Sequence, residues 1–118
     1  MGITQERLVG QLEREIAAIA DPRVSKSVNA LLIKPMPMQC SWDYGSPGET
    51  YPCWKIAESA ERAIGIIYCE QGFGPKCPWG LVWLREPVPA MGQDSGWFPT
   101  FREAAADILD LPAASLNV

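Results

Sequence analysis

Hydrophobic residues near the N-terminus recur at the spacing of one helical face, which is typical of an amphipathic helix. The apolar stripe consists of Leu8, Leu12, Ile16 and Ile19. Thr4 can cap this helix by accepting a backbone N–H hydrogen bond. Asp21-Pro22 should end it, because the residue before a proline avoids helical backbone angles. The pattern therefore predicts a helix over residues 4–20.

Four short segments further along the chain show the alternating or uniformly apolar patterns of β-strands. They span residues 28–33, 53–58, 64–70 and 81–84. We expect Pro35 and Pro37 to end the first strand, because proline cannot donate to a β-ladder. In the second strand, alternation places Trp54 and Ile56 on one face and Ala57 on the other.

The third and fourth segments are apolar on both faces. In the third, Ile64, Ile66 and Tyr68 should point one way and Ile67 and Cys69 the other. Strands of this kind are central in a sheet and covered on both sides. The connections between the segments are short, which favours antiparallel pairing.

A second helical stripe follows at residues 100–109, where Thr100 and Glu103 match a capping box. The pattern predicts one α+β domain over residues 1–118, with 112–118 as a loose tail. Its antiparallel sheet should have about four strands, with an N-terminal and a C-terminal helix packed on one face. The other face would need the tryptophan-bearing loops, a second copy or a different partner to cover it.

The charge balance and the lack of histidine narrow the function classes. The chain has 14 acidic and 10 basic residues, no basic run and a net charge of −4, which argues against nucleic-acid binding. Without histidine there is no Ser-His or Cys-His nucleophile pair and no histidine metal ligand. We therefore expect no enzymatic activity and no cofactor.

The cysteines are irregularly spaced and lack a Cys-x-x-Cys motif, which favours packed thiols over a metal site. They are Cys40, Cys53, Cys69 and Cys77. The N-terminal segment lacks the pattern of a signal peptide, and no apolar run reaches membrane-spanning length. We expect a cytoplasmic protein with reduced thiols and no membrane association.

Glycine, proline and tryptophan are concentrated in the loops around the predicted strands. Three tryptophans lie in or beside these loops: Trp42, Trp79 and Trp97. Four loop carboxylates accompany them: Asp43, Glu49, Glu70 and Asp94. Aromatic side chains with acidic neighbours are typical of binding hot spots, so we predict that these seven residues bind a protein partner. Trp54 and Trp83 lie on predicted strands and are expected in the core.

Less specific interpretations of the same loops stay open. A loop tryptophan can equally cover an edge of the core, and Asp94 before Ser95-Gly96 is a usual turn residue. Paired carboxylates could perform acid–base chemistry on a sugar or a nucleotide. The segment 72–76 lacks the spacing of a phosphate-binding loop and is better explained as a tight turn.

Several loop segments resemble small bacterial proteins, some of which are similar to immunity proteins of contact-dependent or polymorphic toxin systems. The segments are Trp42-Asp43-Tyr44-Gly45, Tyr51-Pro52-Cys53-Trp54, residues 65–75, Pro78-Trp79-Gly80 and residues 91–98. The resemblance covers residues 42–105 and assigns no role to a single residue. It implies a small, acidic, non-catalytic protein that binds a toxin domain and blocks its active site or an exosite.

Three hypotheses follow from the sequence. The first is an immunity protein that neutralises a basic toxin domain by occlusion. The second is a small carboxylate-dependent enzyme. The third is a homodimeric scaffold that uses the second face of the sheet.

Overall fold

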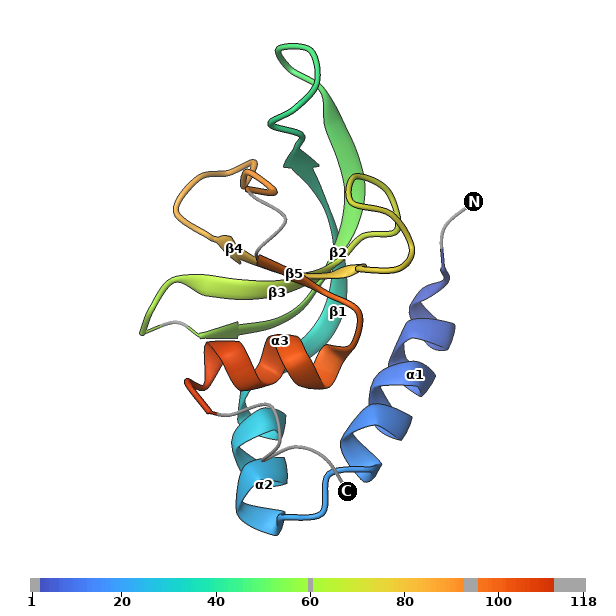
Figure 1. Ribbon diagram of the computed structural model, residues 1–118, viewed down its shortest axis with the longest axis vertical. Coiled ribbons are helices and arrows are strands. Elements are labelled where there is room, and N and C mark those ends of the chain that lie inside the picture. Colours follow the sequence, from blue (N-terminus) through green and yellow to red (C-terminus); the bar gives the residue numbers. More distant parts are fainter. Residues whose placement is uncertain (1–2, 60, 93–95, 112–118) are drawn as a thin grey trace.

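The chain forms three helices and a five-stranded antiparallel sheet within its described residues (Figure 1). This computed structural model describes residues 3–59, 61–92 and 96–111. The helices are α1 (Gln5–Ala17), α2 (Pro22–Leu31) and α3 (Phe101–Ile108). The strands are β1 (Leu32–Ser41), β2 (Thr50–Ser59), β3 (Ile64–Tyr68), β4 (Trp79–Trp83) and β5 (Trp97–Phe98). They pair in sequence order, and the predicted α+β class is confirmed.

Capping groups explain both the correct and the wrong helix predictions. The Thr4 side chain accepts a hydrogen bond from the backbone N–H of Arg7, as expected for the start of α1. The predicted end of the helix at Asp21-Pro22 is wrong, because α1 ends at Ala17 and Asp21-Pro22 begins the next helix. Asp21 caps α2 by accepting from the N–H of Arg23, and Pro22 occupies the first helical position, which suits proline. The prediction of a strand from residue 28 is therefore wrong, because α2 continues to Leu31.

The first strand runs through the two prolines that were expected to end it. β1 lies at the edge of the sheet and pairs only with β2 within the named strands. Pro37 faces Trp54 in that ladder. A proline is tolerated in an edge strand because its missing N–H can lie on the open side. The carbonyl of Pro35 is in turn bonded by the Gln5 side chain of α1, at 2.8 Å.

Side-chain alternation in β3 is confirmed, whereas β2 departs from it. Ile64, Ile66 and Tyr68 belong to the core under the helices, and Ile67 belongs to the core on the opposite face. In β2 the register shifts between Lys55 and Ala57. This irregularity places both Ile56 and Ala57 in the helix-side core, so the predicted opposite placement of Ala57 is wrong.

Each face of the sheet carries its own hydrophobic core. On the helix side, side chains of all three helices pack against the sheet, and Phe101 of α3 lies against Trp79 with ring centroids 5.6 Å apart. On the other side, buried strand residues pack with loop residues such as Met91 and Phe73. The loops therefore cover the second face, which is one of the three coverings that the sequence left open.

A short strand, β5, completes the sheet and was absent from the sequence prediction. Gly80 of β4 faces Trp97 of β5. A Cβ atom at Gly80 would collide with the indole of Trp97. This glycine gives space to an aromatic ring and does not mark a loop. Within the described part of the chain, no helix has the length and hydrophobicity needed to cross a membrane.

Candidate functional site

Four aromatic side chains meet where the β1–β2 loop approaches the β3–β4 loop. We call this group the loop-face cluster; it consists of Trp42, Tyr44, Tyr51 and Phe73. The rings of Trp42 and Phe73 lie edge to face with centroids 5.0 Å apart, and Trp42 and Tyr44 do so at 5.2 Å. Such contacts are a preferred geometry for aromatic pairs and hold the rings in place. Tyr44 is nevertheless 61% exposed, so the cluster reaches the surface.

Glu49 closes the β1–β2 loop by using both of its carboxylate oxygens. Oε1 accepts the backbone N–H of Ser46 at 3.0 Å, and Oε2 accepts the hydroxyl of Tyr51 at 2.8 Å. The backbone carbonyl of Glu49 also accepts the N–H of Trp42. Gly45 leaves room for this carboxylate, because a Cβ there would push against Glu49 and Trp42. Glu49 thus fixes the loop that presents Trp42 and Tyr44.

These bonds predict a pH-dependent loop. The Ser46 N–H and the Tyr51 hydroxyl both stabilise the charged carboxylate, so the pKa of Glu49 lies below its usual range. Because the pKa is lower in the folded state, the stabilisation is complete at neutral pH and is lost as the pH falls through the folded-state pKa. In an NMR titration, the amide of Ser46 should shift with a midpoint below the usual glutamate range.

The variant Glu49→Gln provides the control for this titration, because it should remove the acid transition at Ser46. A transition that survives in Glu49→Gln, or a midpoint at or above the usual glutamate pKa, would contradict the assignment.

Asp43 links the same loop to the segment that follows β4. Its Oδ2 accepts the backbone N–H of Gly92 at 3.0 Å. Next to this bond, Ser41 exchanges two backbone hydrogen bonds with Pro89 and Met91. The structure therefore brings Trp42, Asp43 and Glu49 together in one loop. Asp94 lies outside the described residues.

Trp79 and Trp97 lie in the core, which corrects their expected position in exposed loops. Trp79 is 1% exposed and packs against Tyr68, with ring centroids 4.7 Å apart. Trp97 is 4% exposed, and its indole N–H donates to the carbonyl of Met91. Trp97 belongs to β5, which the sequence did not predict, and Trp79 begins β4, two residues before the predicted segment 81–84. Neither is available as a surface anchor.

Trp83 shows the opposite error. It was expected in the core but is 56% exposed. It pairs with Ile64 at the end of β4, whereas Trp79 pairs with Tyr68 at the other end. The guanidinium of Arg85 lies 4.6 Å from the centre of the Trp83 ring. Trp54 is half-buried against the helix-side core.

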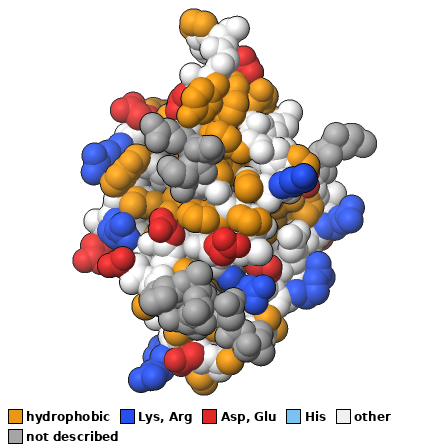
Figure 2. All heavy atoms as spheres, in the orientation of Figure 1, with side chains coloured by type: hydrophobic (Ala, Val, Ile, Leu, Met, Phe, Trp, Pro, Cys, Tyr) orange, Lys and Arg blue, Asp and Glu red, His pale blue; other side chains and the backbone are white. Residues whose placement is uncertain are grey.

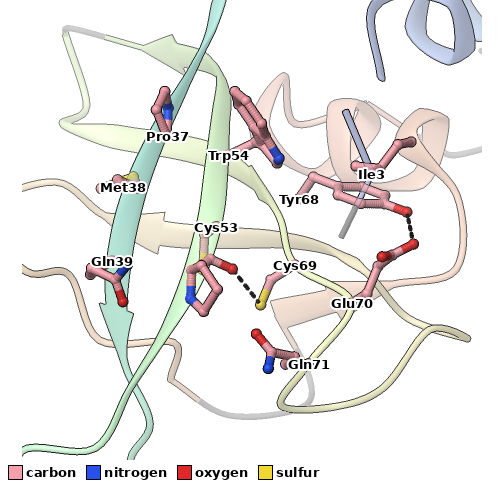
Figure 3. Close-up of a pocket in the computed structure, with 11 residues that line it drawn as sticks. Ile3, Pro37, Met38, Gln39, Cys53, Trp54, Tyr68, Cys69, Glu70 and Gln71 are labelled. Atoms are coloured by element: carbon pink, nitrogen blue, oxygen red, sulfur yellow. Dashed lines mark hydrogen bonds between the residues drawn. The ribbon is translucent and has the colours of Figure 1, made fainter. Parts of the chain in front are cut away.

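Glu70 lies apart from the loop-face cluster, beside a hollow of about 650 Å³ (Figure 3). Its Oε2 accepts the hydroxyl of Tyr68 at 2.7 Å. Burial, together with this bond to Glu70, raises the pKa of Tyr68, so the phenol stays protonated and donates. The structure therefore separates Glu70 from Asp43 and Glu49, and no hydrogen bond among the described residues joins two of these carboxylates.

The buried cysteines pack against one another in the core on the loop side of the sheet. All four cysteines are free thiols, and Cys40, Cys53 and Cys69 are buried. Contacts with the other two thiols raise the pKa of Cys53, with Cys40 the largest cause. The Cys53 thiol donates to the carbonyl of Tyr51 and the Cys69 thiol to the carbonyl of Pro52. The neighbouring Cys53 side chain lowers the pKa of Cys69. In the described ranges, no three side chains among histidine, cysteine, aspartate and glutamate are placed to hold a metal ion.

Sequence reasoning missed three members of the loop-face cluster: Tyr44, Tyr51 and Phe73. The sequence signal that could have identified them was their position in or beside the same glycine-rich loops as Trp42.

Comparison with protein-family models, curated proteins and solved structures finds no match to this chain.

Proposed function

We propose that this protein is a binding module that neutralises a basic bacterial toxin domain by occlusion, in the manner of an immunity protein. The observation that carries the proposal is the exposed ring of Tyr44, held by edge-to-face contacts with Trp42 and Phe73. Tyrosine and tryptophan are enriched among residues that dominate binding energy. A side chain that is ordered before binding loses less entropy when the partner arrives.

Charge supports a basic partner. The chain carries a net charge of −4, and Asp43 and Glu49 lie in the loop that presents Tyr44. Figure 2 shows hydrophobic side chains gathered over the upper part of one face, with acidic side chains beside them. Complementary charge speeds association and disfavours wrong partners. The choice of a toxin among basic partners rests on the sequence-based expectation that residues 42–105 resemble small bacterial proteins, some of which are similar to immunity proteins.

The test is capture of the tagged protein from a lysate of its native host, followed by mass spectrometry. We expect a stoichiometric basic protein that is toxic when expressed alone and harmless when expressed with this chain. A partner whose toxicity is unchanged by coexpression would contradict immunity. Recovery of the chain alone, as a monomer or homodimer, would contradict the binding function as well.

A further inference from the structure

The hollow beside Glu70 exists because the β1–β2 hairpin is longer than the rest of the sheet. β1 and β2 have 10 residues each, whereas β3 and β4 have 5. The hairpin extends past the N-terminal end of α1 (Figure 1), and residues of both its strands line the hollow. Ile3, before α1, forms one border, and Trp54 and Tyr68 contribute aromatic surface (Figure 3). A volume of about 650 Å³ lies within the range of binding sites, about 300–1,000 Å³.

The residues that line this hollow include an acidic side chain but no basic one. Glu70 is the single acidic residue of its lining, and neither lysine nor arginine contributes to that lining. Tyr68 occupies one carboxylate oxygen of Glu70. The other oxygen receives no hydrogen bond and joins no ion pair within the described ranges. Gln39 and Gln71 add polar amide groups to the wall.

We propose that this hollow binds an arginine side chain of the protein partner, with its guanidinium on Glu70 and its alkyl stem against Trp54. The inference rests on the proposed function and names the group that the partner inserts. Arginine fits better than lysine, because its guanidinium is weakly hydrated and presents several N–H donors in one plane to a carboxylate. The remaining volume accommodates the adjoining backbone of the partner.

The first test uses a probe and the unmodified protein. N-acetyl-arginine-N-methylamide is titrated while NMR follows the indole N–H of Trp54 and the amides of residues 69–71. A saturable shift at millimolar concentration is expected. The citrulline analogue, which has the same shape but no charge, should shift these signals at least tenfold less. Equal shifts with both probes, or shifts only outside the hollow, would overturn the inference.

The second test compares two glutamate variants. Glu70→Gln keeps the shape of the side chain and its bond from Tyr68 but removes the charge, so it should weaken binding of the arginine probe about tenfold or more. Glu86→Gln, at an exposed position away from the lining, should leave binding unchanged. Matching thermal unfolding curves would show that both variants are folded. Unchanged binding in Glu70→Gln would overturn the inference.

Experiments with the captured partner distinguish a failure of this inference from a failure of the proposed function. If a neutralised toxin binds Glu70→Gln as tightly as the original chain, the immunity function stands and the hollow is not the arginine site. If the arginine probe binds but no toxin is neutralised, the guanidinium selectivity of the hollow stands and the immunity function fails.

Discussion

Replacement of Trp79 by alanine is expected to lower the free energy of unfolding by about 3–5 kcal/mol. The side chain is 1% exposed and lies between Tyr68 and Phe101, so it joins the sheet to α3. Its removal loses a large buried apolar surface and leaves a cavity that the rigid surroundings fill incompletely. The loss is a large fraction of the total stability of a small domain, which is about 5–15 kcal/mol.

Trp83→Ala is the matched control, because it removes the same side chain from the same strand. Trp83 is 56% exposed and contacts Arg85, so its loss should cost less than about 1 kcal/mol. Urea unfolding followed by circular dichroism measures both values. Trp79→Phe provides a milder substitution if Trp79→Ala does not fold. Similar losses for Trp79→Ala and Trp83→Ala would contradict the assignment of Trp79 to the core.

Tyr44→Ala should weaken binding of the toxin domain that we propose as the partner about 30-fold, which corresponds to a hot-spot loss of about 2 kcal/mol. Tyr44 projects from the loop-face cluster and is 61% exposed. Its ring rests on Trp42 and Phe73 without filling a buried space. The substitution should therefore reduce affinity while leaving the unfolding free energy nearly unchanged. Isothermal titration calorimetry with the purified toxin domain measures the affinity.

Trp83→Ala serves again as the control, since Trp83 is an exposed aromatic residue at the end of β4 that is distant from the β1–β2 loop in the ladder. Its affinity for the toxin should equal that of the original chain. If Tyr44→Ala and Trp83→Ala bind equally well, the loop-face cluster is not the contact surface. If Trp83→Ala alone loses affinity, the contact surface lies at the other end of the sheet.

The sequence predicted those elements whose signals are local. Thr4 and Thr100 accept the expected hydrogen bonds at the starts of α1 and α3. The two-faced apolar pattern of β3 was enough to place Ile66 and Ile67 in opposite cores. These signals depend on neighbours within one turn or one strand, so no knowledge of distant contacts was needed.

The errors arose where a distant contact determined the local structure. Gly80 was interpreted as part of a loop, but it provides space for Trp97, 17 residues later in the sequence. Pro37 was interpreted as a strand terminator, but the edge position of β1 removes the conflict. Neither fact is encoded in the residues next to Gly80 or Pro37.

The candidate site was predictable only in part for the same reason. Trp42, Asp43 and Glu49 lie together because they share one short loop. Glu70 is bonded to Tyr68, and that side chain points to the helix side of the sheet. Glu49 and Glu70 thus lie on different surfaces, because each is bonded to a tyrosine two residues away, and Tyr51 and Tyr68 belong to the cores on opposite faces of the sheet.

The prolines of β1 also bear on how two copies of this chain could meet. Alternate residues of an edge strand direct their N–H and C=O groups outward. The backbone N–H and C=O of Ser41 point outward, because they bond Pro89 and Met91. Gln39 and Pro37 lie two and four residues earlier in β1, so their backbone groups point outward as well. Pro37 has no N–H to offer, and the outward groups of Ser41 are already occupied. A second copy would find the N–H of Gln39 free to donate, but no free outward N–H at Pro37 or Ser41 on either side of it. This edge therefore resists intermolecular sheet extension and the aggregation that begins with it.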